Sequence, residues 1–223
     1  IPVLSWIFLK AKCRYCSHPI SIRYPLVELM TAIFFSLCLF CTGWIQNFSM
    51  GFYGVISGWI LVSFLIILTF IDIDYMILPD SITYSGSLVG LILIFCSGYI
   101  LKTPSYSLLI EHFYSYLLAY FGVYMFSYIV KLLINKPALG AGDAKLFAMS
   151  AAWLGFDGLE VTITLSFLLS AVFILFGFIF RFIKRGEYIP FGPFICCSIF
   201  FVWFFGSDFW FKSLGDIFWW KYI

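Results

Sequence analysis

The sequence is poor in charged residues, which make up only 11% of its 223 positions. Ordinary soluble domains carry about 25% charged residues. Hydrophobic residues make up 63% of the chain, which is more apolar surface than a soluble fold of this length can bury. Several apolar runs reach the ~20 residues that a helix needs to cross a ~30 Å hydrocarbon core. The composition therefore excludes an ordinary soluble domain and predicts an integral membrane protein.

The apolar runs also lack the period-2 alternation that is typical of a transmembrane β-barrel. Backbone groups in lipid must be paired internally, so membrane spans are either helices or closed barrels. We therefore expect an all-α, polytopic transmembrane helix bundle with about seven spans. The expected spans are residues 26–45, 52–71, 81–101, 108–134, 144–156, 159–182 and 189–206. The fifth of these is short for a span, and we expect it to be a crossing that is buried in protein.

Three regions are expected along the chain. Residues 1–25 form a basic cytoplasmic segment with a Cys-x-x-Cys pair, 26–206 form the bundle, and 207–223 form an aromatic tail. No basic patch with interleaved aromatic residues indicates nucleic-acid binding. The chain opens without Met and without a signal-like segment, and we interpret it as a fragment whose true N-terminus lies upstream.

Lys and Arg residues are distributed unevenly between alternate loops. Ten of the thirteen fall on one side of the seven-span topology, and loops rich in Lys and Arg face the cytoplasm. The two acidic loops, at residues 72–80 and at Asp143, fall on that same side. We therefore expect both acidic loops to face the cytoplasm.

Two aspartates stand at membrane boundaries, since Asp72 ends the second expected span and Asp143 opens the fifth. Charged residues at membrane depth are costly and tend to be functional. Two carboxyl groups that share a low-dielectric site cannot both ionise easily, so such a pair holds one proton. One carboxylate can then activate water while the protonated partner polarises a peptide carbonyl. The alternative is that each Asp is a helix cap or a solvated helix end.

Neighbouring residues suggest how such a site would hold a substrate. Gly140 and Gly142 leave no side chains beside Asp143, so an extended backbone could approach closely there. Lys145 is either a partner of Asp143 or a cytoplasmic anchor. Glu28, at the start of the first span, is either a favourable charge at a helix N-terminus or a substrate contact. The turn at 190–193 is either a membrane re-entry turn or a wall of the cleft.

The same residues are also compatible with two other classes of function. One is a proton-coupled small transporter that uses the same aspartates, and the other is a scaffold protein without catalytic activity. A transporter predicts further polar residues deep inside the spans. Such residues are scarce here, and the carboxylates lie near one border. This placement favours hydrolysis at one membrane face.

Four segments, in this order, resemble the prepilin leader peptidases of bacterial type IV pilus, competence and type II secretion systems, which are membrane aspartic proteases of the Gly-x-Gly-Asp class. The segments are Ile1-Pro2-Val3-Leu4-Ser5-Trp6 followed by Cys13, Cys16 and Glu28; Asp72 with Leu78-Pro79-Asp80; Gly140-Ala141-Gly142-Asp143-Ala144-Lys145; and Ile189-Pro190-Phe191-Gly192-Pro193. Together they cover most of the chain. The occurrence of all four segments in this order is a far more specific indication of the family than any one motif.

The resemblance implies a function and a location. Asp72 and Asp143 would be the catalytic pair of an endopeptidase in the bacterial inner membrane. The substrates would be prepilins or pseudopilins, whose short basic leader is cut at the cytoplasmic face after a Gly. Many family members then N-methylate the new terminus with S-adenosylmethionine, so a methyltransferase activity is implied by resemblance alone.

The departure from the family lies at the N-terminal end. Family members commonly have one further span and another Cys-x-x-Cys before the segment where this chain starts. Two such pairs would supply the four ligands of a tetrahedral zinc ion. Only Cys13 and Cys16 are present here, with His18 as a candidate third ligand. The expected zinc site is thus incomplete, and the alternative is a pair of free thiols.

Overall fold

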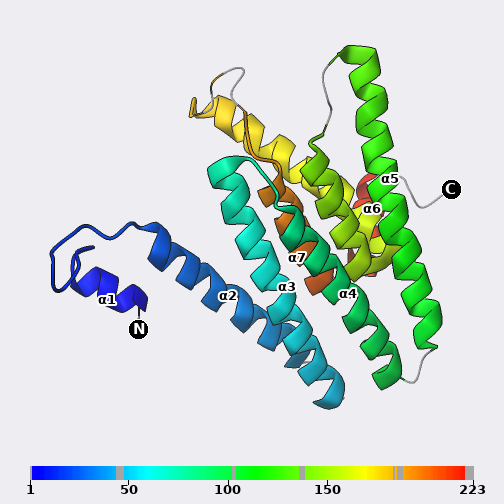
Figure 1. The fold of residues 1–223 in the computed structure, drawn as a ribbon, viewed down its shortest axis with the longest axis horizontal. Helices are drawn as coiled ribbons and strands as arrows, with labels where there is room; N and C mark the ends of the chain where they lie inside the picture. The colour runs from blue at the N-terminus through cyan, green and yellow to red at the C-terminus, as the bar shows by residue number, and fades with distance from the viewer. Residues whose placement is uncertain are drawn as a thin grey trace. The chain divides into compact units, whose positions relative to one another are not determined.

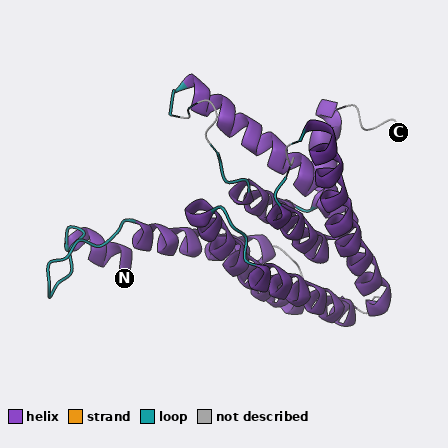
Figure 2. Cartoon of the chain, turned by 45° about the horizontal axis from the view of Figure 1, so that its top comes forward, coloured by secondary structure: helices purple, strands orange, loops and turns teal. Residues whose placement is uncertain are grey.

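A computed structural model describes residues 2–43, 48–101, 104–135, 139–182, 184 and 188–218. Over these residues the regular structure is entirely helical apart from a single isolated β-bridge, as Figure 2 shows. The chain divides into two compact units, Ile1–Ile66 and Ile67–Ile223. The prediction of an all-α helix bundle is confirmed.

The first unit holds α1 (Pro2–Phe8), α2 (Arg23–Gly43) and the first part of α3 (Phe48–Tyr75). Between α1 and α2 the chain folds into a small hairpin, in which the N–H of Cys13 donates to the carbonyl of His18 at 2.8 Å. The indole of Trp6 ties α1 to this hairpin through a 3.0 Å hydrogen bond to the carbonyl of Ile20.

Helices α2 and α3 contact each other through one aromatic pair. The rings of Phe35 and Trp59 stack with centroids 5.4 Å apart, and Nε1 of Trp59 donates to the carbonyl of Phe35 at 3.1 Å. The indole N–H therefore finds a partner inside an apolar contact, as buried Trp residues usually require.

The second unit contains the end of α3 and five further helices. These are α4 (Asp80–Leu101), α5 (Ser105–Ile134), α6 (Ala141–Ile179), α7 (Gly192–Phe205) and α8 (Ser207–Phe218), as Figure 1 shows. Helix α4 begins at Asp80, directly after Pro79, one residue before the start of the expected span 81–101. Helix α5 ends at Asn135, which adopts the left-handed conformation common at helix C-termini.

Helix α6 folds back on itself at Gly155, where φ is 71° and ψ is −168°. On a straight helix Phe147 and Phe167 would lie about 30 Å apart. Their rings nevertheless both contact the ring of Phe191, at centroid distances of 6.3 and 5.2 Å. The segments before and after Gly155, called here the first and second arms of α6, therefore run back along each other.

The first arm of α6 lies in the centre of the second unit, and nearly all of its residues from Ala144 to Trp153 are buried. Nε1 of Trp153 donates to the carbonyl of Gly86 in α4 at 2.9 Å. On the α5 side, Nδ1 of His112 lies 3.2 Å from the carbonyl of Ala152. The predicted protein burial of this short apolar run is confirmed.

Five described helices are long and apolar enough to cross a membrane, and a sixth crossing is formed if α7 and α8 count as one broken span. This count of five or six takes α6 as one crossing, whereas the expected number of about seven takes each of its two arms as a crossing. The difference arises because the predicted fifth and sixth spans are the two arms of the single element α6. The structure is that of a multi-pass membrane protein.

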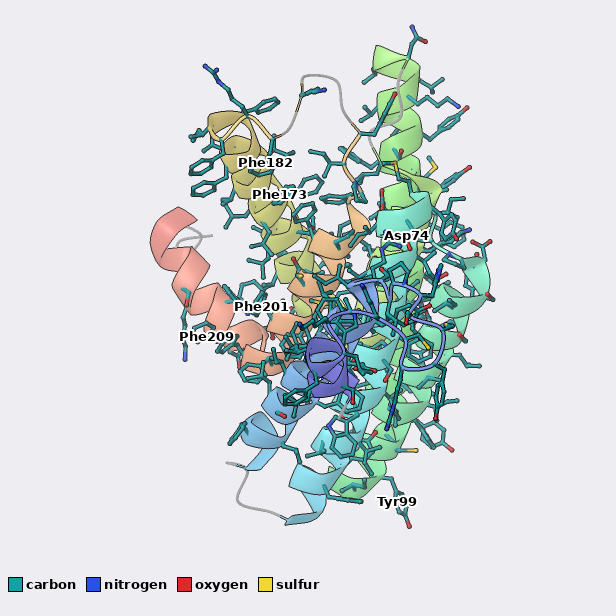
Figure 3. The ribbon with its side chains drawn as sticks, turned by 90° about the vertical axis from the view of Figure 1, so that its left-hand side faces the viewer. Asp74, Tyr99, Phe173, Phe182, Phe201 and Phe209 are labelled. Atoms are coloured by element: carbon teal, nitrogen blue, oxygen red, sulfur yellow. The ribbon has the colours of Figure 1, made fainter. Side chains whose placement is uncertain are left out.

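Helices α7 and α8 meet at Gly206 with a bend of 101°. Trp210 of α8 packs with α6 and α7 around Val161, Leu165 and Val202. Figure 3 shows Phe201 of α7 and Phe209 of α8 on this side of the unit. The division into the regions 1–25, 26–206 and 207–223 stays a prediction, and Trp219 and Trp220 of the expected tail lie outside the described residues.

Candidate active site

A cavity of about 460 Å³ lies in the second unit where α3 ends and α4, α6 and α7 begin. Its wall consists of Asp72, the segment between α3 and α4, the first turn of α6 and the segment that precedes α7. Figure 3 labels Asp74, near the end of α3, well apart from Tyr99, near the end of α4. The cavity lies toward the end of α3 that holds Asp74.

Asp72 stands in the last turn of α3 and is 6% exposed. Its Oδ2 atom accepts a 2.9 Å hydrogen bond from the backbone N–H of Gly192, the first residue of α7. The first N–H groups of a helix have no partner within the helix. The start of α7 therefore supplies a donor to this carboxylate.

Asp143 is held in a similar way at the start of α6. Its Oδ2 atom accepts a 3.0 Å hydrogen bond from the N–H of Gly140, the residue that caps the helix. The N–H of Asp143 in turn donates to the carbonyl of Gly140 at 3.1 Å. Each of the two predicted catalytic carboxylates thus has one oxygen bonded to the backbone N–H of a glycine at a helix N-terminus.

The structure brings Asp72 and Asp143 to the same cavity, as the sequence predicts. Three helices, α4, α6 and α7, present their N-termini to this cavity. Each N-terminus carries a partial positive charge of roughly half an elementary charge. These dipoles offset part of the negative charge of the two aspartates, neither of which forms an ion pair with a described residue.

The glycines of this site provide space for specific neighbours. A Cβ atom on Gly192 would lie 2.6 Å from Oδ2 of Asp72, a distance that no side chain tolerates. A Cβ atom on Gly142 would lie 3.0 Å from Cβ of Leu78. Gly142 lines the cavity, and its missing side chain makes room for Leu78; its role in substrate approach stays a prediction. On Gly140 a Cβ atom would lie 3.2 Å from Oδ2 of Asp143.

Lys145 lines the cavity and forms its ion pair with Asp80 of α4; the sequence left it open whether Lys145 is a partner of Asp143 or a cytoplasmic anchor. Positions two residues apart do not face each other on a helix. The side chain of Lys145 is 17% exposed and that of Asp80 61%, and the ammonium group also lies 5.7 Å from the ring centroid of Tyr84. Sequence reasoning missed Asp80 as a residue of the site, because an Asp after Pro at a helix start usually only caps the helix.

Gly192 is the other residue of the site whose role was missed. The turn at 190–193 was expected either to re-enter the membrane or to form a wall of the cleft, and Pro190 and Phe191 do line the cavity. No sequence signal identifies the N–H of Gly192 as the partner of Asp72. Glu28 is exposed on α2 in the first unit, and its role in substrate binding stays a prediction.

The Cys-x-x-Cys pair lies at the tip of the hairpin in the first unit, with Cys16 exposed and Cys13 partly exposed. The N–H of Cys16, with smaller contributions from the N–H of Tyr15 and the thiol of Cys16, hydrogen-bonds Cys13 and lowers the pKa of its thiol. Metals bind the thiolate form. Within the described residues, however, no three His, Cys, Asp or Glu side chains are close enough to hold a metal ion.

Comparison with known families gives two matches. The model of the type IV leader peptidase family matches residues 59–177, which include both aspartates. The model of the bacterial peptidase A24 N-terminal domain matches residues 1–42. No solved structure gives a significant match.

Several curated proteins, each named prepilin leader peptidase/N-methyltransferase, are similar to this chain. The protein from Aeromonas salmonicida (strain A449) is 36% identical over 201 residues, covering 89% of this chain and 63% of the relative. The protein from Neisseria gonorrhoeae is 36% identical over 198 residues, with the same coverage. The chain thus spans just under two thirds of the length of these two relatives.

A third relative, from Xanthomonas campestris pv. campestris, is 34% identical over 211 residues. The match covers 93% of this chain and 68% of the relative. With more than half of its residues matched by the family model and relatives of this similarity, the chain belongs to the type IV leader peptidase family.

Proposed function

We propose that the chain is a membrane-embedded aspartic endopeptidase, which removes the basic leader of type IV prepilins or pseudopilins at the cytoplasmic membrane face. The observation that carries the proposal is the shared cavity, in which Asp72 and Asp143 each have one oxygen held by a backbone N–H. Family membership supports the same activity.

The geometry suits peptide hydrolysis by water. Oδ2 of each aspartate is bonded to a glycine N–H, and Oδ1 of each has no protein donor among the described residues. The two free oxygens are the atoms that would act on water and substrate. The ionised carboxylate takes a proton from the attacking water, and the protonated carboxyl donates to the oxygen of the scissile carbonyl.

The charge of the cavity supports a cationic substrate segment. Among the described residues, three carboxylates, those of Asp72, Asp80 and Asp143, line it together with one cation, Lys145. The side chain of Asp80 is 61% exposed, so its carboxylate is accessible from solvent although it pairs with Lys145. A leader that carries Lys or Arg would therefore meet a net negative wall.

The distribution of basic residues supports a cytoplasmic orientation. Helices α5 and α6 both end at the end of the bundle where α3 ends and α4 begins (Figure 1). Lys131 lies in the last turn of α5, and Arg181 directly follows α6. Basic residues at span ends mark the cytoplasmic side, so the cavity would face the cytoplasm of a bacterial inner membrane.

Leader cleavage by the full chain in membranes tests the proposal. Asp72→Asn and Asp143→Asn should each abolish cleavage of a prepilin that the unmodified chain processes. The amide of Asn can neither take a proton from water nor donate one to the scissile carbonyl as the carboxyl group does. Asp157→Asn is the matched control, since Asp157 is exposed on the same helix as Asp143 but lies beyond Gly155. Full cleavage by either of the first two variants would refute the assignment.

N-methylation of the new terminus, with S-adenosylmethionine as methyl donor, is proposed from the names of the relatives alone. The new terminal amine would be released at the cavity that holds Asp72 and Asp143, so the methyl donor would have to bind nearby. Mass spectrometry of the cleaved pilin, with and without S-adenosylmethionine, tests this step. An unmethylated terminus in the presence of the donor would refute it.

Zinc binding by Cys13 and Cys16 is a further proposal. Zinc prefers four ligands in tetrahedral geometry, and thiolates are among its usual ligands. The hairpin presents two thiols three positions apart at its tip, and the lowered pKa of Cys13 favours the thiolate. These residues fit one half of a structural zinc site, which would need further ligands to complete it.

A further inference from the structure

Ser127 in α5 contacts the segment that leads into the candidate active site. Its hydroxyl donates to the carbonyl of Leu139 at 2.7 Å and accepts from the N–H of Leu139 at 3.3 Å. A single side chain thus satisfies both backbone groups of the residue before Gly140. This contact fixes the start of α6 to α5.

The two polar groups of one peptide unit connect Ser127 to Asp143. The carbonyl of Leu139 and the N–H of Gly140 belong to the same planar peptide. Ser127 bonds the carbonyl end of this peptide, and Oδ2 of Asp143 accepts from its N–H end at 3.0 Å. Because the unit is rigid, the bond to Ser127 sets the direction in which the N–H of Gly140 points.

We propose that Ser127 is a positioning residue for Asp143, acting through the peptide between Leu139 and Gly140. The proposal rests on the proposed peptidase function. Ser127 has no place in the wall of the cavity that holds the two aspartates. It lines a separate cavity of about 180 Å³, which lies between α5 and the start of α6 and also contacts Gly140.

The partner of Ser127 distinguishes it from other hydroxyls in the bundle. Ser and Thr side chains inside helices usually bond a carbonyl one turn back in their own helix. Ser115, three turns earlier in α5, does so with the carbonyl of Glu111 at 2.8 Å. The hydroxyl of Ser127 reaches instead to a different segment, twelve residues along the chain.

Hydrogen bonding also strengthens the contact at the far end of the peptide. A carbonyl that accepts a hydrogen bond polarises its peptide and makes the N–H a better donor. Ser127 thereby supports the bond from Gly140 to Asp143 both in direction and in strength. Without the hydroxyl the peptide can rotate, and the carboxylate of Asp143 loses its fixed orientation toward the substrate.

Kinetics of leader cleavage by the full chain test this role. Ser127→Ala should lower kcat about fivefold to tenfold, the effect of one lost hydrogen bond on the barrier, and leave KM nearly unchanged, because the cavity wall is intact. Ser127→Thr should restore most of kcat, since the hydroxyl is kept and the adjacent cavity has room for a methyl group.

Ser115→Ala is the matched control, because the same hydroxyl is removed from a buried site in the same helix. It should keep kcat, and thermal stability in detergent should confirm that all three variants are folded. Unchanged kcat in Ser127→Ala, equal losses in Ser127→Ala and Ser115→Ala, or no recovery in Ser127→Thr would each overturn the positioning role. Asp143→Asn in the same series separates the two proposals, since its full activity would refute the peptidase function itself.

Discussion

The backbone N–H of Gly192 donates a 2.9 Å hydrogen bond to Oδ2 of Asp72, a residue 120 positions earlier in the chain. This bond joins the start of α7 to the end of α3 at the cavity. The close approach is possible only because residue 192 has no side chain: a Cβ atom there would lie 2.6 Å from the same oxygen. Glycine is needed at this position for space.

Gly192→Ala should therefore disturb the carboxylate of Asp72 directly. Either the side chain of Asp72 rotates away or α7 shifts, and in both cases the hydrogen bond is lost. Loss of a charge-assisted hydrogen bond costs about 1.5–3 kcal/mol, so we expect leader cleavage to fall by at least about tenfold. The rate of cleavage by the full chain in membranes measures this effect.

Gly122→Ala provides the control for this substitution. Gly122 lies within α5, and a Cβ atom there would meet nothing within 4 Å. Alanine in the middle of a helix is favoured over glycine by about 0.5–1 kcal/mol, so this variant should be at least as stable and fully active. Wild-type cleavage by Gly192→Ala would show that the bond from residue 192 does not matter for catalysis.

Gly142 and Leu78 should behave as a coupled pair. A methyl group on residue 142 would lie 3.0 Å from Cβ and 3.4 Å from Cδ1 of Leu78. Gly142→Ala should push the first turn of α6 away from the segment before α4 and reduce cleavage. Leu78→Ala in the same chain removes the outer atoms of that contact and should restore part of the rate. Failure of the double variant to recover would indicate that Gly142 is required for substrate access, as the sequence first suggested.

Much of the helical framework could be predicted from the sequence, because long apolar runs bounded by Pro, Gly and charged residues set helix limits. The expected span 81–101 corresponds to α4 (Asp80–Leu101), and 108–134 to α5 (Ser105–Ile134). The break between 156 and 159 was placed close to the actual fold-back at Gly155. The two expected spans on either side of that break correspond to the two arms of α6, which the non-helical Gly155 separates.

The candidate site was predictable in part. Asp72 and Asp143 stood out because carboxylates at the ends of apolar runs are unusual, and the structure brings both to one cavity. Their donors were harder to identify. The bond from Gly140 is local, but that from Gly192 depends on the packing of α7 against α3, which no local pattern encodes. The partner of Lys145 was missed for the same reason, since Asp80 lies 65 positions away.

The contact between α4 and the first arm of α6 gives a prediction about stability. A Cβ atom on Gly90 would lie 2.5 Å from Cδ1 and Nε1 of Trp153. Adding a methyl group to a packed interior typically costs about 1–3 kcal/mol, so Gly90→Ala should lower the Tm of the protein in detergent. Gly90 does not line the cavity, so this substitution acts through packing against Trp153.

A double variant separates crowding from a general effect of alanine at position 90. Trp153→Phe removes part of the crowding ring, although it also removes the 2.9 Å hydrogen bond to the carbonyl of Gly86. Because residues in contact are not additive, the loss of Tm in the double variant should be smaller than the sum of the two single losses. Simple additivity would contradict the contact between these residues.

Zinc content tests the proposed role of the hairpin in the first unit. The two thiols of Cys13 and Cys16 lie at its tip, and the hydrogen bonds to Cys13 lower the pKa of that thiol. Zinc binding requires deprotonated thiols, so the full chain purified without chelator should contain zinc. Cys13→Ser or Cys16→Ser should reduce the zinc content to background.

Cys96→Ser is the control, since Cys96 is an exposed thiol in α4 and its loss should leave the metal in place. Equal zinc in all four proteins, measured by atomic absorption, would assign the metal to other residues, and a zinc-free wild-type chain would identify the pair as free thiols.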